Sequence, residues 1–72
     1  MSVENEQPFP GGARGVITAV VVGDATLQAK GADGSWVNVP DGNVGDTVYS
    51  FFAPTGSVWR FTGMTGSVEI FS

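Results

Sequence analysis

The side chains best able to do chemistry in this sequence are carboxylates, because its 72 residues include seven aspartates and glutamates but no histidine and no cysteine. Without the commonest general base and the thiol nucleophile, only a pair of carboxylates is left for acid–base catalysis. Glu69 alternates with Val68 and Ile70 and is expected to point out of a strand. The other candidates stand beside glycines in predicted turns, where aspartate makes local hydrogen bonds: Asp24, Asp33, Asp41 and Asp46. The pattern indicates no carboxylate pair, and we expect that the protein is not an enzyme.

The acidic turns are also the only candidate metal ligands. Asp41-Gly42-Asn43 together with Asp46 comes nearest to a calcium loop, but it lacks the dense D-x-D-x-D-G spacing of such loops. Zinc sites of the usual kind need histidine or cysteine, which this chain does not contain. We interpret the segment as a turn and expect neither a metal nor a cofactor.

The small number of positive charges limits the kinds of partner that the chain can bind. The formal net charge is −4, and the only cations are Arg14, Lys30 and Arg60. Nucleic-acid binding needs clustered lysines and arginines that displace counterions from phosphates, and anionic membrane surfaces need similar clusters. We therefore expect no nucleic acid and no membrane as partner. The first residues, MSVENEQPFPGG, lack the basic and apolar stretches of a signal peptide, so synthesis in the cytoplasm is expected.

Turn residues recur every eight to twelve positions, since the chain contains 11 glycines and 4 prolines. Short β-branched and aromatic runs at this spacing predict an all-β fold: a small antiparallel β-sandwich or barrel, jelly-roll-like, in a single domain over residues 15–72. Gly23-Asp24 is expected to form a tight hairpin turn, and Pro40–Asn43 a second turn. No segment has helical periodicity. Six strands are predicted: Val16–Val22, Ala25–Lys30, Ser35–Val39, Thr47–Phe52, Ser57–Thr62 and Ser67–Phe71.

Residues 1–14 differ from the rest in composition and are predicted to form an extended N-terminal arm. Pro8 and Pro10 enforce extended backbone around Phe9, and Gly11-Gly12 can serve as a hinge. Two interpretations stay open at this point. The segment is either a disordered terminus or an arm that becomes ordered when Phe9 docks on a neighbouring subunit.

The aromatic residues are the main candidates for contact with another molecule. Phe51 and Phe52 are consecutive and must face opposite sides of their sheet, so one face cannot bury every large side chain. A symmetric subunit contact is the simplest way to cover the remainder. A sugar stacked on Trp36 or Trp59 beside Asn38, Asp41 or Arg60 is the alternative. The candidate contact residues are Phe9, Trp36, Phe51, Phe52, Trp59 and Phe71.

The small size of the chain also favours assembly. A chain of 7.4 kDa buries only about 61% of its surface on folding, so its own core gives a narrow stability margin. Small domains usually add disulfides or a structural metal, and this chain has no cysteine and no histidine. Oligomerisation is the stabilising device that remains, and we expect a homo-oligomer.

Two stretches of the chain resemble short structural proteins of tailed bacteriophages. The first is ATLQAKGADGSWVNVPDGN, and the second is GDTVYSFFAPTGSVWRFTGMTGSVEI. They are similar to the TLQ…DGSW-V-V hairpin, the G…PTG-VR element and the last strand after a G-TG turn of that group, although Trp59 stands here between Val58 and Arg60. The resemblance covers about two-thirds of the chain.

The resemblance implies a virion protein made in the host cytoplasm. Proteins of this kind are small β-modules that act as capsid decoration (cement) proteins or as head and tail accessory subunits, and they commonly form trimers. A homotrimer that contacts the major capsid protein or another virion protein is therefore expected. A small carbohydrate- or ligand-binding β-module of a tail fibre or a cell-wall binding protein is the alternative.

Overall fold

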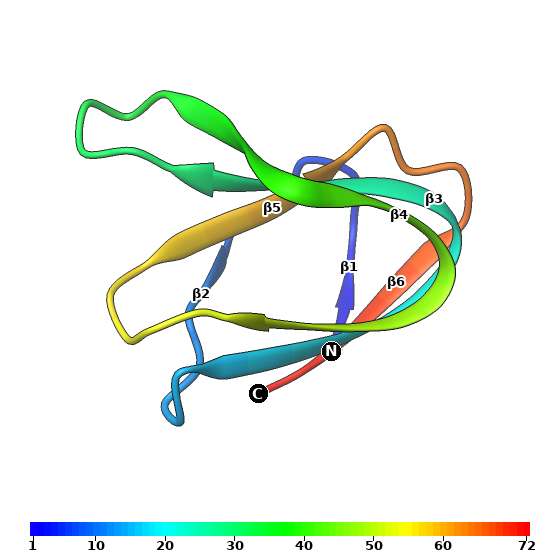
Figure 1. The fold of residues 1–72 in the computed structure, drawn as a ribbon, viewed down its shortest axis with the longest axis horizontal. Helices are drawn as coiled ribbons and strands as arrows, with labels where there is room; N and C mark the ends of the chain where they lie inside the picture. Colours follow the sequence, from blue (N-terminus) through cyan, green and yellow to red (C-terminus); the bar gives the residue numbers. More distant parts are fainter.

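The protein is all-β, and the computed structural model describes all 72 residues. The chain contains no helix, hence none long and apolar enough to cross a membrane. Its one antiparallel sheet curls into a half-barrel with overall extents of 29 × 24 × 20 Å (Figure 1). The six strands are β1 (Ser2–Val3), β2 (Phe9–Pro10), β3 (Val16–Lys30), β4 (Trp36–Phe52), β5 (Val58–Thr62) and β6 (Ser67–Phe71). The predicted fold class is confirmed.

The centre of the fold is one long bent hairpin formed by β3 and β4. Their antiparallel register runs from Val16 opposite Phe52 to Lys30 opposite Trp36. Both strands curve through the same bend, where β4 lies in front of β3 (Figure 1). The two halves of β3 therefore face different directions and can take different neighbours on their second edge.

The predicted hairpin turn at Gly23-Asp24 is wrong, because the chain bends there without reversing. The register shifts between Val21 and Asp24, which marks a β-bulge inside a continuous strand. Gly23 has a φ of +81°, and a Cβ at this position would lie 2.7 Å from the Thr65 hydroxyl oxygen. The Asp24 backbone N–H donates to that hydroxyl oxygen at 2.8 Å. The loop before β6 thus occupies the bulge and favours the bend over a turn.

The predicted turn at Pro40–Asn43 is also wrong, since these residues lie inside β4. A second register shift lies opposite them, between Thr26 and Gln28 of β3. Asp41 takes a left-handed φ of 58°, and Gly42 is buried where a Cβ would lie 2.9 Å from the carbonyl oxygen of Val39. The segment has the composition of a turn but forms a bulge in a continuous strand.

The last two strands pair with different halves of β3. β6 pairs with its first half, from Thr18 opposite Phe71 to Val22 opposite Ser67. β5 pairs with its second half, where Leu27 lies opposite Phe61. The bend at Gly23 separates the two pairings, so the sheet order is β1-β6-β3-β5-β2, with β4 along the other edge of β3.

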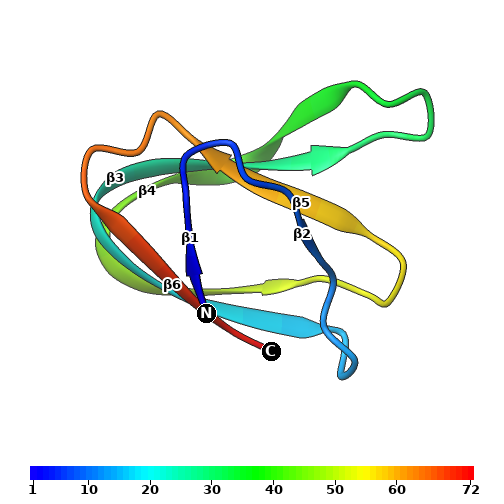
Figure 2. The same cartoon turned by 180° about the vertical axis from the view of Figure 1, so that it is seen from behind.

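The N-terminal residues differ from the expected arm, because residues 1–12 pack against their own domain as a strap. β1 pairs with β6 and β2 pairs with β5, so the strap crosses the side of the sheet away from β4 (Figure 2). The Glu6 backbone N–H donates to the Phe61 carbonyl oxygen at 2.7 Å, and that of Gly12 donates to Ala53 at 2.8 Å. The backbone is extended at Phe9–Pro10, but a turn in which Glu6 takes a φ of 61° precedes it, and the segment does not leave the domain.

The core lies between the concave side of the sheet and this strap. Phe9 is only 1% exposed and stacks on Phe61 with ring centroids 6.0 Å apart. Phe51 lies between Trp59 and Tyr49, with centroid distances of 5.2 Å and 5.6 Å. No polar or charged residue is buried, so the interior is held together by apolar packing.

Phe9→Ala is expected to destabilise the protein by about 3–5 kcal/mol, because it removes a buried aromatic ring from the core. The free energy of unfolding in urea, measured on dilute protein, checks this. Phe52→Ala is the matched control: this ring is 72% exposed, and its loss is expected to change stability by less than about 0.5 kcal/mol. Equal stability of the two variants would mean that the strap does not contribute Phe9 to the core.

Candidate functional site

The convex side of the first half of the sheet carries a group of exposed apolar side chains, which we call the outer apolar face. Alternation along β3, β4 and β6 places every second residue on this side. The opposite set, including Ile17, Ala19 and Val21, fills the core. The outer apolar face consists of Val16, Val20, Val22, Val48, Phe52 and Phe71.

These side chains lie in rows across three neighbouring strands. Phe52 of β4 is opposite Val16 of β3, and Val48 of β4 is opposite Val20. Between the two rows, Thr18 lies between Ser50 and Phe71, and the Thr18 and Ser50 hydroxyl oxygens are 3.0 Å apart in a hydrogen bond. The exposed fractions reach 67% for Val48 and 72% for Phe52. Directly opposed side chains in a sheet are in contact within each row, and the Thr18–Ser50 pair lies between the two rows.

An open hollow indents this surface where the hairpin bends. It is lined by residues of β3 and β4, among which Val21 has its side chain in the core: Val20, Val21, Val22, Asp46, Thr47 and Val48. The one carboxylate of the hollow, Asp46, accepts a hydrogen bond from the Gly23 backbone N–H at 2.8 Å. The hollow therefore extends an apolar surface and does not present a group of polar ligands.

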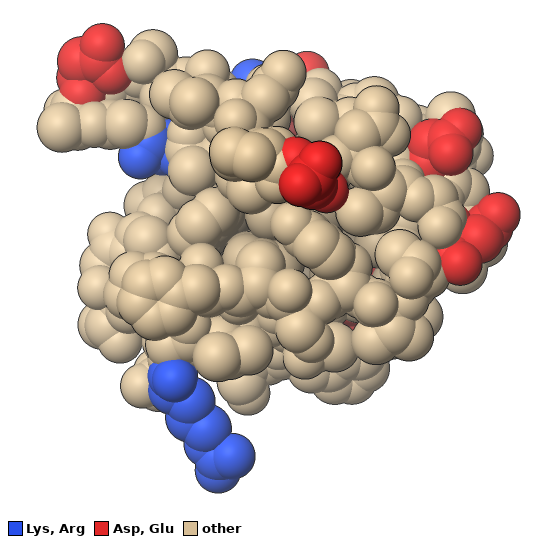
Figure 3. Space-filling view, in the orientation of Figure 1, with Lys and Arg blue, Asp and Glu red and all other residues tan.

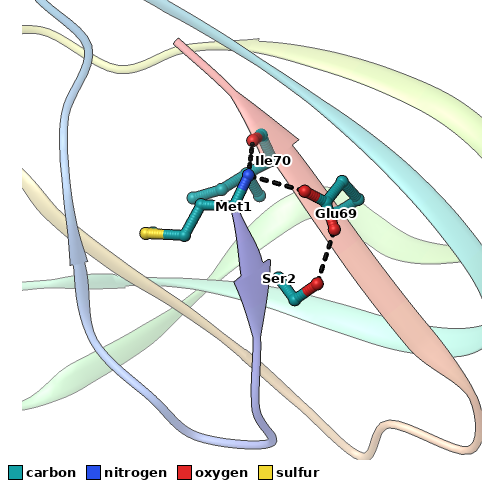
Figure 4. Close-up of polar contacts among 4 residues, drawn as sticks. All are labelled: Met1, Ser2, Glu69 and Ile70. Carbon is teal, nitrogen blue, oxygen red and sulfur yellow. Dashed lines mark hydrogen bonds and ion pairs between the residues drawn. The ribbon is translucent and has the colours of Figure 1, made fainter.

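Glu69 is the charged residue within the rows, since it lies opposite Val20 on β6. Its carboxylate is 2.7 Å from the N-terminal amine of Met1 and accepts a 2.6 Å hydrogen bond from the Ser2 hydroxyl (Figure 4). The N-terminal amine, and after it Ser2, holds the pKa of Glu69 below its ordinary value. A neighbouring positive charge thus balances this carboxylate beside the outer apolar face.

The second half of the sheet carries a different surface, the Trp36 cluster, formed by Trp36, Arg60, Lys30, Gln28 and Asn38. The Arg60 guanidinium lies 4.3 Å from the centroid of the Trp36 ring, and the Lys30 amine lies 6.0 Å from it. The Arg60 Nε donates to Gln28 Oε1 at 2.7 Å, and the Gln28 Nε2 donates to Asn38 Oδ1 at 2.8 Å. Two of the three cations are therefore gathered at one tryptophan.

The structure divides the six predicted contact residues among three places. Phe9 and Phe51 are in the core, so neither is available to a neighbouring subunit in this structure. Trp59 is half-buried against Phe51, and its Nε1 donates to the Ser57 hydroxyl at 2.6 Å. Only Phe52 and Phe71 lie together on the outer apolar face, while Trp36 stands in its own cluster.

The valines of the outer apolar face are absent from the sequence-based set of contact residues. The run VITAVVV has apolar residues at both odd and even positions, so apolar side chains must lie on both sides of the strand. This pattern could have identified the exposed valines from the sequence. In a sheet with a single covered side, such a run must leave half of its valines exposed. Val16, Val20 and Val22 are that half.

No three His, Cys, Asp or Glu side chains form a group that could hold a metal ion, and no buried side-chain nitrogen or oxygen lacks a hydrogen-bond partner. The face seen in Figure 3 is largely uncharged, with scattered acidic groups. No protein-family model, no curated protein and no solved structure matches this chain. The outer apolar face and the Trp36 cluster are therefore the two candidate functional surfaces of the molecule.

The attachment of β1 to β6 is expected to weaken in acid. Because the pKa of Glu69 is lowered in the folded state, its contribution is present above the ordinary carboxylate pKa and is lost as the pH falls through the lowered value. The Ile70 backbone N–H, which donates to the Met1 carbonyl oxygen, reports on this attachment. Its hydrogen-exchange protection factor should fall between about pH 6 and about pH 3.

Glu69→Gln should remove most of this pH dependence, because the glutamine carries no titrating carboxylate. Glu4→Gln is the matched control, since the Glu4 side chain is exposed and accepts no hydrogen bond from the strap or from β6. An equal loss of Ile70 protection in Glu69→Gln and in the wild type would contradict a role for this carboxylate.

Proposed function

We propose that this protein is a non-enzymatic virion structural subunit that assembles symmetrically with further copies of itself through the outer apolar face. The observation that carries the proposal is the group of six exposed apolar side chains on one side of β4, β3 and β6. A soluble monomer rarely exposes a large contiguous apolar surface, and such surfaces mark contact sites. The resemblance to small structural proteins of tailed bacteriophages supports the same conclusion.

The size of the protein supports an assembly function. A stable interface buries about 800 Å² on each partner. This amounts to about a fifth of the 4147 Å² surface of the protomer, so one contact occupies most of one side of so small a molecule. Burial of that area offsets the narrow stability margin of a 72-residue core, because apolar burial contributes about 25 cal/mol per Å².

A second copy is the occupant that suits the outer apolar face best. The protein carries a net charge of −4, which makes two copies repel each other wherever their charges meet. On this face the one acidic group in the rows, Glu69, is already paired with the N-terminal amine. This face can therefore be buried against another copy without placing an unpaired charge in the contact.

The proposed assembly is a homotrimer on the virion, where it acts as a capsid decoration or cement subunit in contact with the major capsid protein or another virion protein. The trimer and the virion location rest on the resemblance. A cement subunit stabilises a particle through buried area and needs no catalytic group. Nucleic acid and membrane are not among the proposed partners.

The Trp36 cluster supports a second candidate function, the binding of a carbohydrate. Trp36 is partly exposed beside Gln28, Asn38 and Arg60, which supply hydrogen-bonding groups of the kind that sugars use. However, the Arg60 guanidinium already covers one face of the tryptophan ring. A stacked sugar would have only the other ring face, and we therefore rank this function second.

Val20→Lys is expected to weaken self-association by about 100-fold or more, because an unpaired charge buried in an interface costs several kcal/mol. Val20 lies at the centre of the rows, and the carboxylate opposite it, Glu69, is already paired with the N-terminal amine. Sedimentation velocity over a concentration series measures the effect.

Thr26→Lys is the matched control, because it introduces the same charge on the same side of the same strand but in the second half of the sheet. It should leave the solution mass unchanged. A wild-type protein that stays monomeric at about 100 µM, or a Val20→Lys variant with wild-type association, would refute assembly through the outer apolar face.

Trp36→Ala is expected to leave the solution mass unchanged, because Trp36 lies outside the outer apolar face. Wild-type protein and this variant should also show equal, background-level retention on an array of immobilised bacterial glycans. Retention of the wild type that disappears in Trp36→Ala would instead favour the carbohydrate-binding candidate.

A further inference from the structure

The second edge of β4 has no partner in the protomer. β4 pairs only with β3, and the order β1-β6-β3-β5-β2 leaves it at the border of the sheet. Because β4 lies in front of β3 at the bend, its free edge faces the viewer there in Figure 1. A strand edge of this kind presents a row of unpaired N–H and C=O groups that can pair with another chain.

The first part of this edge is protected against such pairing. Pro40 lacks a backbone N–H, and Asp41 and Asp46 take left-handed φ angles of 58° and 35° that interrupt the regular strand. Proline, charges and bulges are the devices by which proteins block edge-to-edge association. Residues 36–46 of β4 carry all three.

The second part, Thr47–Phe52, carries none of them. Its sequence TVYSFF contains no charge, no proline and no glycine, and its residues are mostly β-branched or aromatic. Its register with β3 is regular from Val16 opposite Phe52 to Val21 opposite Thr47. An uncharged edge of six residues in regular register is suited to accept another strand.

We propose that Val48–Phe52, within this edge, pairs in antiparallel fashion with the same segment of a second copy, about a two-fold axis at Ser50. This contact lies on the edge of the sheet and not on the outer apolar face, so it goes beyond the assembly proposed above. Edge pairing joins the two sheets into one, with β3 and β4 of one copy continued by β4 and β3 of the other. The interface is isologous, because the same surface serves both copies.

Symmetry restricts the register of this pairing. A two-fold axis perpendicular to the sheet reverses the strand and keeps its faces, so each residue pairs with one of the same parity. With Ser50 on the axis, each Val48 lies opposite Phe52 of the other copy. These are aromatic–β-branched pairs, which stabilise antiparallel sheets. On the inner side Tyr49 lies opposite Phe51 of the other copy, and Ser50 lies opposite itself.

The ends and the charges of the segment agree with this register. Beyond Phe52, the backbone N–H of Ala53 already donates to the Gly15 carbonyl oxygen at 2.7 Å, and Pro54 has no N–H to donate. Asp46 then lies opposite Pro54 of the other copy, so the nearest carboxylates do not face each other. Val48 and Phe52 also belong to the outer apolar face, and the pairing therefore makes the two outer faces contiguous.

Ser50→Lys and Ser50→Glu test the contact, since either variant places two like charges side by side at the axis. Ser50 is exposed, so neither variant should disturb the fold, which circular dichroism verifies. Each variant alone should have a lower solution mass than the wild type by sedimentation velocity, because the two-fold contact is lost. An equimolar mixture of the two should recover the wild-type mass, because lysine then meets glutamate. Asn43→Lys, on the protected part of β4, should keep the wild-type mass.

Ser50→Cys supplies a second readout, because the chain has no other cysteine. Mild oxidation should convert most of the Ser50→Cys protein into disulfide-linked dimers, whereas Asn43→Cys should give a small fraction under the same conditions. Wild-type mass in Ser50→Lys, or equal cross-linking of the two cysteine variants, overturns the edge contact.

Because Ser50 also lies between the rows of the outer apolar face, the readouts specific to the edge contact are recovery of the mass in the mixture of Ser50→Lys and Ser50→Glu and the cross-linking of Ser50→Cys. If Val20→Lys lowers the mass and neither readout is seen, the outer-face assembly stands without the edge contact. If both readouts are seen and Val20→Lys keeps the wild-type mass, the edge contact stands without the outer-face assembly.

Discussion

The structure depends on one constraint: the β3–β4 ladder bends without breaking. Bulges at Gly23 and at Asp41–Gly42 absorb the bend, so the register continues from Val16 to Lys30. Because the two halves of β3 then point in different directions, β6 can pair with the first and β5 with the second. The same bend gives the molecule two separate convex surfaces, one apolar and one built around Trp36.

When a single sheet curls, only the side chains on its concave side can pack against one another and be buried within the same chain. The strap of residues 1–12 covers the concave side and contributes Val3 and Phe9 to the core. Nothing in the chain is left to cover the convex side. The valines at even positions of β3 and the rings of Phe52 and Phe71 are therefore exposed as a direct consequence of the topology. Burial of these residues requires a second molecule.

Sequence reasoning reached the fold class and the positions of the last two strands, since Ser67–Phe71 is β6 itself and Ser57–Thr62 differs from β5 by one residue. The predictions were wrong where the same residue types are common in both a tight turn and a β-bulge. Gly23-Asp24 suits a tight turn and a bulge equally well, and the choice depends on Thr65, which is 41 residues away from Asp24 along the chain. The alternation of side chains along a strand shows that Phe51 and Phe52 face opposite sides of the sheet. Which of the two rings is buried depends on the direction in which the sheet curls. The burial of Phe9 likewise follows from tertiary packing that no local pattern contains.

The two parts of β4 differ in whether their free edge is protected against pairing with another strand, and this difference bears on assembly. Pro40, Asp41 and Asp46 show that this strand carries edge-protecting residues, yet they are confined to its first part. The unprotected part, Thr47–Phe52, is the part that borders the outer apolar face. An exposed edge beside an exposed apolar face would be an aggregation hazard in a protein that works as a monomer. In a subunit whose edge pairs about a two-fold axis, the free N–H and C=O groups of Val48–Phe52 are used by one partner copy, so no further strand can add there. The outer apolar faces of the two copies then lie side by side and present twice the area to another molecule.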